Sequence, residues 1–119
     1  MVEKPFDIKD RTFQFGTQII GLCLNLEKRF GGTKTLSSQL FRSGTSIGAN
    51  IEEAYGTQTD PDFLNKFVIA LKEALETSYW LRQLTASKIT SAAEVEDLIT
   101  ECEEIKKILG AIITKKRKK

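Results

Sequence analysis

Glutamates in two segments are the side chains of this sequence best suited to catalysis. Glu52 and Glu53 lie in one segment, and Glu73 and Glu76 lie in another. Carboxylates gathered in a helical bundle can bind Mg²⁺ and act on phosphate esters. However, Glu73 points away from the predicted core stripe of its helix, and the two pairs share no obvious focus. We therefore predict surface charges or interhelical ion pairs, with no catalytic residue, metal site or cofactor. A metal-dependent hydrolase of phosphate esters is the least favoured alternative.

The sequence contains no histidine among its 119 residues. This absence excludes Ser-His and Cys-His nucleophilic catalysis, imidazole acid/base steps and the Glu-x-x-His di-iron sites of many four-helix bundles. The two cysteines, Cys23 and Cys102, lie within apolar helical patterns with no second cysteine nearby. We expect both to be buried free thiols rather than disulfide partners or zinc ligands.

A run of basic residues ends the sequence, and it is the candidate nucleic-acid-binding site: Lys115, Lys116, Arg117, Lys118 and Lys119. The chain has 18 basic and 16 acidic residues, so the body carries 13 − 16 = −3 and the tail +5. Such a run can neutralise phosphates and give salt-sensitive affinity for nucleic acid. Alternatively, it complements a helix dipole and keeps a frayed terminus soluble. Because no aromatic residues are interleaved with it, we expect electrostatics and shape to lead any RNA binding.

Four amphipathic segments must position these groups. Apolar residues recur every three or four positions over about 10–30, 35–55, 61–87 and 91–114, ahead of the tail at 115–119. The connections are too short to cross a bundle, so sequence neighbours must pack antiparallel. The prediction is a single-domain, all-α, antiparallel up-down-up-down four-helix bundle. With no signal peptide or membrane-spanning run, we expect a cytoplasmic protein without membrane contact.

Several helix ends carry recognisable signals. Asp10 is a candidate N-cap for the first helix, and Asp60 precedes Pro61 at the start of the third. Ser91 and Glu94 have the spacing of a capping box for the fourth. These signals support the boundaries that the apolar periodicity predicts.

The segment 43–48 is rich in glycine, serine and threonine, which favours either a helix or a phosphate-binding loop. The apolar rhythm runs through it in register from Leu40 to Ile51, and the lysine and spacing of a P-loop are absent. A helix is therefore the better prediction. In a helix, Gly44 and Gly48 form a notch for a closely approaching backbone, either inside the monomer, which we favour, or between subunits.

Other polar and aromatic residues of the second and third helices indicate contacts beyond the core. Arg42 and Glu53 project away from the apolar stripe, so they are either solvated or bound to a neighbouring helix or subunit. Ile69 and Trp80 are expected to face outward as an interface, unless they are isolated exposed residues. Arg82 falls on the predicted inner face, where it would cap the core end or pair with a glutamate.

Two motifs carry a family resemblance. RSGTSIGANIEEAYG at 42–56 and KEALETSYWLRQL at 72–84 resemble the four-helix bundle proteins encoded in intervening sequences of bacterial 23S rRNA genes. The likeness extends from the FQF of the first helix to the ECEEIKKIL of the fourth. By this resemblance, the family signature and assembly residues are Arg42, Ser43, Gly44, Thr45, Gly48, Asn50, Glu52, Glu53, Glu73, Glu76, Tyr79, Trp80 and Arg82.

The family is also similar to the accessory variability protein of diversity-generating retroelements. That similarity implies a homopentamer that handles nucleic acid through a basic surface. We therefore expect a noncatalytic, oligomeric, nucleic-acid-associated protein that binds structured RNA or a ribonucleoprotein partner. The alternative is a protein-protein scaffold or adaptor without nucleic-acid binding.

Overall fold

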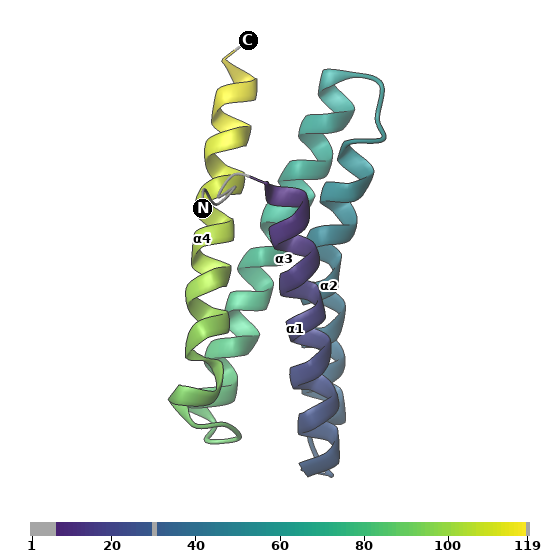
Figure 1. Ribbon diagram of the computed structural model, residues 1–119. Helices are drawn as coiled ribbons and strands as arrows, with labels where there is room; N and C mark the ends of the chain where they lie inside the picture. The colour runs from purple at the N-terminus through teal and green to yellow at the C-terminus, as the bar shows by residue number, and fades with distance from the viewer. Residues whose placement is uncertain (1–6, 30, 119) are drawn as a thin grey trace, which may run out of the picture.

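The computed structural model describes residues 7–29 and 31–118, and in these ranges the regular structure is entirely helical. The helices are α1 (Ile8–Arg29), α2 (Lys34–Ala54), α3 (Asp60–Ala86) and α4 (Ala92–Arg117). They run alternately down and up a single elongated bundle (Figure 1). Within the described ranges, no helix is long and apolar enough to cross a membrane.

The packing follows the order of the helices in the chain. Each helix packs extensively against the next, and α1 makes a smaller contact with α4 that closes the bundle. Arg11 supports this closing contact by donating to Glu101 from Nε at 3.0 Å and from Nη2 at 2.6 Å. The predicted all-α, antiparallel four-helix fold is confirmed.

Local capping moves two helix starts away from the predicted residues. The first helix begins at Ile8, two residues before the predicted start, because the Asp7 carboxylate accepts the Asp10 amide at 3.3 Å. Thr59, not Asp60, caps α3, since the Thr59 side chain accepts the Asp62 amide at 3.2 Å. The predicted capping box of α4 is present, with the Ser91 amide donating to Glu94 at 3.0 Å. The predicted end of the first helix at residue 30 lies outside the described residues.

The last helix continues three residues past its predicted end, through Arg117. Lysine and arginine are good helix formers, and their positive charges complement the negative end of the helix dipole. Most of the basic tail is therefore the final turn of α4. Its last predicted member, Lys119, lies outside the described residues.

The core combines large aliphatic and aromatic side chains with small ones. Cys23 and Cys102 are both buried free thiols, as predicted. Burial raises the pKa of Cys23 to about 11 and that of Cys102 to about 12. The largest fully buried side chains are Phe15, Phe67, Ile8, Ile19, Leu26, Leu40, Ile47, Ile51, Leu81, Leu84, Ile105 and Leu109.

The buried face of α3 differs from the prediction. Arg82 is exposed, although it was expected on the inner face, and Leu75 is 50% exposed. Ala70, Ala74 and Thr77 are buried instead. Small side chains let α3 approach α2 and α4 closely, and a prediction that weights large apolar residues overlooks such a face.

Candidate functional site

The glycines of α2 form the predicted notch, and α1 fills it. A Cβ atom on Gly44 would lie 2.7 Å from Ile19 Cγ2, and one on Gly48 would lie 3.0 Å from the Thr12 carbonyl oxygen. A glycine of α1 also faces the backbone of α2. A Cβ atom on Gly16 would lie 3.8 Å from the Thr45 Cα atom. The notch therefore packs two helices inside the monomer.

The hydroxyl and amide side chains of the α2 signature satisfy hydrogen bonds within the bundle. Ser43 is fully buried and accepts a hydrogen bond from Thr77 Oγ1 of α3 at 2.9 Å. Thr45 donates to the Phe41 carbonyl at 2.8 Å, and Asn50 donates to the Ser46 carbonyl at 2.8 Å. The segment 43–48 lies inside the continuous helix α2, where the backbone amides bond within the helix, which removes the phosphate-loop alternative.

Arg42 joins the signature residues of α2 to those of α3. Its Nη1 donates to Glu73 Oε1 at 3.1 Å, and its Nη2 donates to Glu76 Oε2 at 2.5 Å. Trp80 Nε1 donates to the same Glu76 oxygen at 2.9 Å. A guanidinium suits this arrangement because its planar fork can serve two carboxylates at once. The partners of Arg42 thus lie on a neighbouring helix of the same chain.

The charges of this cluster stabilise one another. Hydrogen bonds from Arg42 and then from Trp80 hold the pKa of Glu76 below its usual value, and the hydrogen bond to Glu76 raises the pKa of Arg42. The Glu76 and Arg42 side chains are 35% and 49% exposed, so solvent screens the pair. A partly exposed ion pair of this kind contributes about 1 kcal/mol or less.

The four glutamates considered for catalysis are paired with three different cations, Lys9, Lys66 and Arg42. Glu53 accepts from Lys66 at 2.7 Å, and Glu52 lies 3.8 Å from the Lys9 ammonium. Glu73 and Glu76 are bound by Arg42 instead. In the described residues, no three histidine, cysteine or acidic side chains gather where they could hold a metal ion.

The aromatic residues of α3 only partly match the predicted outward interface. Trp80 is partly buried and packs against the core, so it does not face outward as predicted, whereas Ile69 has intermediate exposure. Tyr79 is the more exposed residue, at 45%, and its ring lies edge-on to Trp80 at 5.0 Å. The Trp80 indole N–H donates to Glu76 of the same helix, so its polar edge is bonded within α3.

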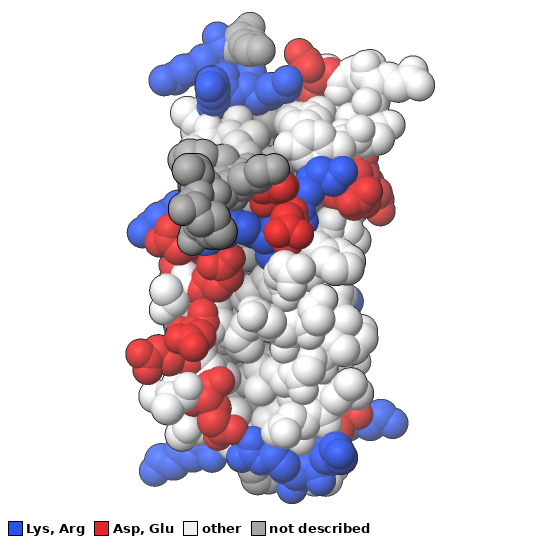
Figure 2. All heavy atoms as spheres, in the orientation of Figure 1, with Lys and Arg blue, Asp and Glu red and all other residues white. Residues whose placement is uncertain are grey.

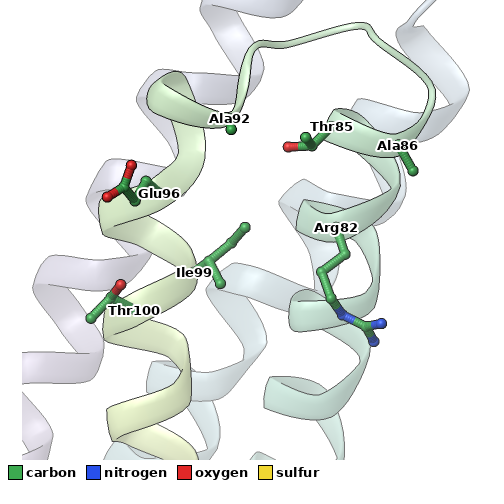
Figure 3. Close-up of a pocket in the computed structure, with 7 residues that line it drawn as sticks. All are labelled: Arg82, Thr85, Ala86, Ala92, Glu96, Ile99 and Thr100. Carbon is green, nitrogen blue, oxygen red and sulfur yellow. The ribbon is translucent and has the colours of Figure 1, made fainter.

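Arg82 lines a hollow of about 510 Å³ between α3 and α4. Figure 3 shows Ile99 projecting into this space from α4, with Thr85 and Arg82 on the opposite helix. The Arg82 guanidinium lies over the Tyr79 ring, 5.9 Å from its centroid, rather than capping the core end. The remaining lining residues are Ala86, Ala92, Glu96 and Thr100.

Basic residues gather at both ends of the bundle. The C-terminal end of α4 presents Lys115, Lys116, Arg117 and Lys118, and acidic side chains follow the flank of α4 below it (Figure 2). We call this end, defined by residues 115–118, the cationic end. Lys116 is its most enclosed member and lies 3.3 Å from Asp60 Oδ1.

Aromatic residues from other segments lie at the cationic end, although none is interleaved with the basic run in the sequence. Phe63 of the first turn of α3 has the Lys116 ammonium over its ring, 4.9 Å from the centroid. Tyr55 lies edge-on to Phe63 at 5.3 Å and is 51% exposed. The antiparallel order was the signal available in the sequence, because it brings the start of the third helix beside the end of the fourth.

An uncharged surface covers the outer side of α1 and part of α2. Figure 2 shows it as a broad white area between the charged ends. The exposed apolar residues of α1 are Phe13, at 69% exposure, and Leu24, at 56%, and helical spacing puts them on the same side of the helix. Phe13, Thr17, Ile20 and Ala49 help line a hollow of about 450 Å³, and the Lys9 and Glu52 ion pair lies at its charged edge. We call this area, around Phe13 and Leu24, the uncharged face.

These features define a class of protein: an antiparallel four-helix bundle with a glycine-notched second helix, an Arg-Glu-Glu cluster and a cationic end. The sequence model of the family described as 23S rRNA-intervening sequence protein matches residues 4–111. The chain belongs to this family.

A solved structure supports the assignment. It is the crystal structure of a protein of unknown function from the S23 ribosomal protein family of Bacteroides thetaiotaomicron. It is 40% identical to this chain, with a TM-score of 0.84, over 89% of this chain and 97% of that one. No curated protein matches the chain significantly.

Proposed function

We propose that this protein is a noncatalytic, oligomeric, cytoplasmic protein that binds structured RNA or a ribonucleoprotein partner through its cationic end. The observation that carries the proposal is the placement of Lys115, Lys116, Arg117 and Lys118 on a helical turn at one end of the bundle. A helix holds these cations at fixed spacing, so fewer conformations are lost on binding than for a disordered tail.

Charge distribution along the molecule supports end-on binding. Exposed acidic residues on α4, including Glu96, Asp97 and Glu104, repel phosphates from the flank of the bundle. This repulsion acts within about 8–10 Å at physiological ionic strength, so it leaves the end of α4 accessible. Attraction at one end and repulsion along the flank would orient RNA at the cationic end.

The noncatalytic part of the proposal rests on how the glutamates are used. Arg42 and Lys66 bind three of the four candidate carboxylates, and the two sets face different partners. A hydrolase of phosphate esters would need carboxylates that converge on shared metal ions. Ion pairing between helices gives these residues a structural role instead.

The oligomeric part of the proposal uses the uncharged face. Exposed apolar side chains gathered on one face and bordered by charges are typical of surfaces that bind other proteins. A homopentamer, as the family resemblance implies, would bring five cationic ends into one assembly and raise the affinity for RNA through multivalency. Sedimentation velocity should give a pentamer for the wild type and smaller species for Phe13→Glu, with Gln14→Glu as a neighbouring charge control. A monomer at high protein concentration would contradict this part.

Fluorescence anisotropy with a structured rRNA fragment and a retroelement-like RNA tests the binding. Neutralising four phosphates should give a slope of log K against log salt of about −3.6 for duplex RNA, by analogy with DNA. Lys115→Gln combined with Lys116→Gln should weaken binding and reduce the slope by about 1.8.

The opposite end of the bundle provides a matched control. Lys34 and Lys88 are exposed there, and changing both to glutamine removes the same total charge. We expect this control variant to bind nearly as well as the wild type. Equal losses in the two double variants would refute the cationic end as the site.

A protein-binding scaffold without nucleic-acid affinity is the second candidate function. The uncharged face favours it, because this face could bind a different protein as well as another copy of the chain. Absence of RNA binding at low salt would refute the first proposal and leave this one.

A further inference from the structure

The cationic end is also an aromatic end. Phe63 stacks on Phe67 with ring centroids 4.6 Å apart and planes 26° from parallel. Tyr55 meets both rings edge-on, at 5.3 Å from Phe63 and 6.1 Å from Phe67. Contacts of this kind hold aromatic rings in place, so Phe63 is a fixed surface at the start of α3.

A hollow of about 230 Å³ opens beside this ring. Phe63 and Ile112 supply its apolar surface, and Lys115 and Lys116 complete its lining. Lysine is a flexible side chain, so the Lys116 ammonium that now lies over the Phe63 ring can move aside while keeping its charge nearby. The hollow therefore offers a flat apolar surface and two ammonium groups within one site.

A nucleotide has the matching chemistry, since its base has an apolar π face and its phosphate is an anion. Stacking on an aromatic side chain works for every base and needs no hydrogen-bond readout. A base inside a duplex has both faces covered by its neighbours, so only unpaired or terminal bases can stack here. We propose that this hollow binds one unpaired nucleotide of RNA, with the base on Phe63 and the phosphate at Lys115 and Lys116. This inference rests on the proposed function and adds a preference for single-stranded regions.

The charges around the hollow limit which ligands bind. Asp60 holds Lys116 at 3.3 Å, so an incoming phosphate competes with a carboxylate for that ammonium. An isolated phosphate offers no stacking to offset this competition. The base must therefore contribute to binding, which separates this site from a purely electrostatic surface.

The test compares two probes that carry equal charge. One is a short single-stranded oligoribonucleotide, and the other is an abasic oligomer with the same number of phosphates. Stacking of one base should make the intact RNA bind roughly 5- to 150-fold more tightly at the same salt concentration. Phe63→Leu should lower intact-RNA affinity toward the abasic level, whereas Phe63→Tyr, which keeps the ring, should retain it.

The probe comparison on the unmodified protein needs no variant, so it holds even if Phe63→Leu fails to fold. Phe63→Leu should leave binding of the abasic oligomer unchanged. Equal affinities of the unmodified protein for the two probes would overturn the stacking subsite while leaving the proposed function intact. If neither probe nor the structured RNAs bind at low salt, the proposed function itself fails.

Discussion

Replacing Gly44 with alanine tests how closely α1 approaches α2. The new Cβ atom would lie 2.7 Å from Ile19 Cγ2, 2.9 Å from Cγ1 and 3.1 Å from Cβ. Nonbonded carbons prefer separations of about 3.5–4.0 Å, so all three contacts are too short. Ile19 cannot easily turn away, because a β-branched side chain in a helix has one strongly preferred rotamer. The helices must therefore move apart.

The expected magnitude combines two opposing effects. Overpacking a core costs about 1–3 kcal/mol, and three short contacts to one stiff side chain place this case in the upper part of the range. The higher helix propensity of alanine relative to glycine stabilises the folded protein by about 1 kcal/mol and offsets part of that cost. The net destabilisation should be about 1–2 kcal/mol, and the free energy of unfolding should fall accordingly.

Gly21→Ala is the matched control. Gly21 is exposed in the interior of α1, and a Cβ there would meet nothing within 4 Å. This variant should gain up to about 1 kcal/mol from helix propensity alone. Urea unfolding followed by far-UV circular dichroism, at several protein concentrations to account for self-association, should therefore separate the two variants by about 2–3 kcal/mol.

A second variant distinguishes the clash from other causes. Ile19→Ala removes Cγ2 and Cγ1, the two nearest atoms, and leaves only the Cβ contact at 3.1 Å, so Gly44→Ala should destabilise the protein much less in that background. If Gly44→Ala is as stable as Gly21→Ala in the unmodified background, the close approach of α1 to α2 is refuted.

Three further outcomes are expected. Because Arg42 lowers the pKa of Glu76 below 4.5 in the folded protein, their pair stabilises the fold above that pH and loses its effect as the pH falls through the folded-state pKa. Glu76→Gln should therefore lower the free energy of unfolding at neutral pH. If the free energies of unfolding of the variant and the wild type still differ by the same amount at about pH 2, the pairing is contradicted. With its pKa raised from 9.0 to about 11, Cys23 should have roughly 100-fold less thiolate at about pH 8 than an ordinary thiol. Cys102 should be at least as slow toward a thiol reagent, and fast labelling of the native protein would show that burial is incomplete. Asp60→Asn should free its lysine partner and tighten RNA binding by roughly two- to fivefold at low salt; weaker binding in a folded variant would count against competition at the cationic end.

The sequence was sufficient to predict the helices and their order. Apolar periodicity depends on local spacing, and short connections leave antiparallel neighbours as the arrangement available. The same local reasoning predicted the Gly44 and Gly48 notch, which α1 fills. The capping box at Ser91 was also predicted, because its two partners are three residues apart.

Side-chain partners across helices could not be read from the sequence. Arg42 could have faced solvent, a neighbouring helix or another subunit, and the rotation of α3 places it beside Glu73 and Glu76. That rotation of α3 buries small residues against two helices. A prediction based on a stripe of large apolar residues therefore assigned Arg82 and Trp80 to the wrong faces of α3.

The sequence by itself determined the four helices and the charge of the basic tail, since both depend on residue type and local spacing. Tertiary packing alone decided what that charge faces. The antiparallel return of α4 brings Lys116 against Asp60 and over Phe63, residues from the distant start of α3. The tail that looked purely cationic in the sequence thus becomes a cationic and aromatic surface in the folded bundle.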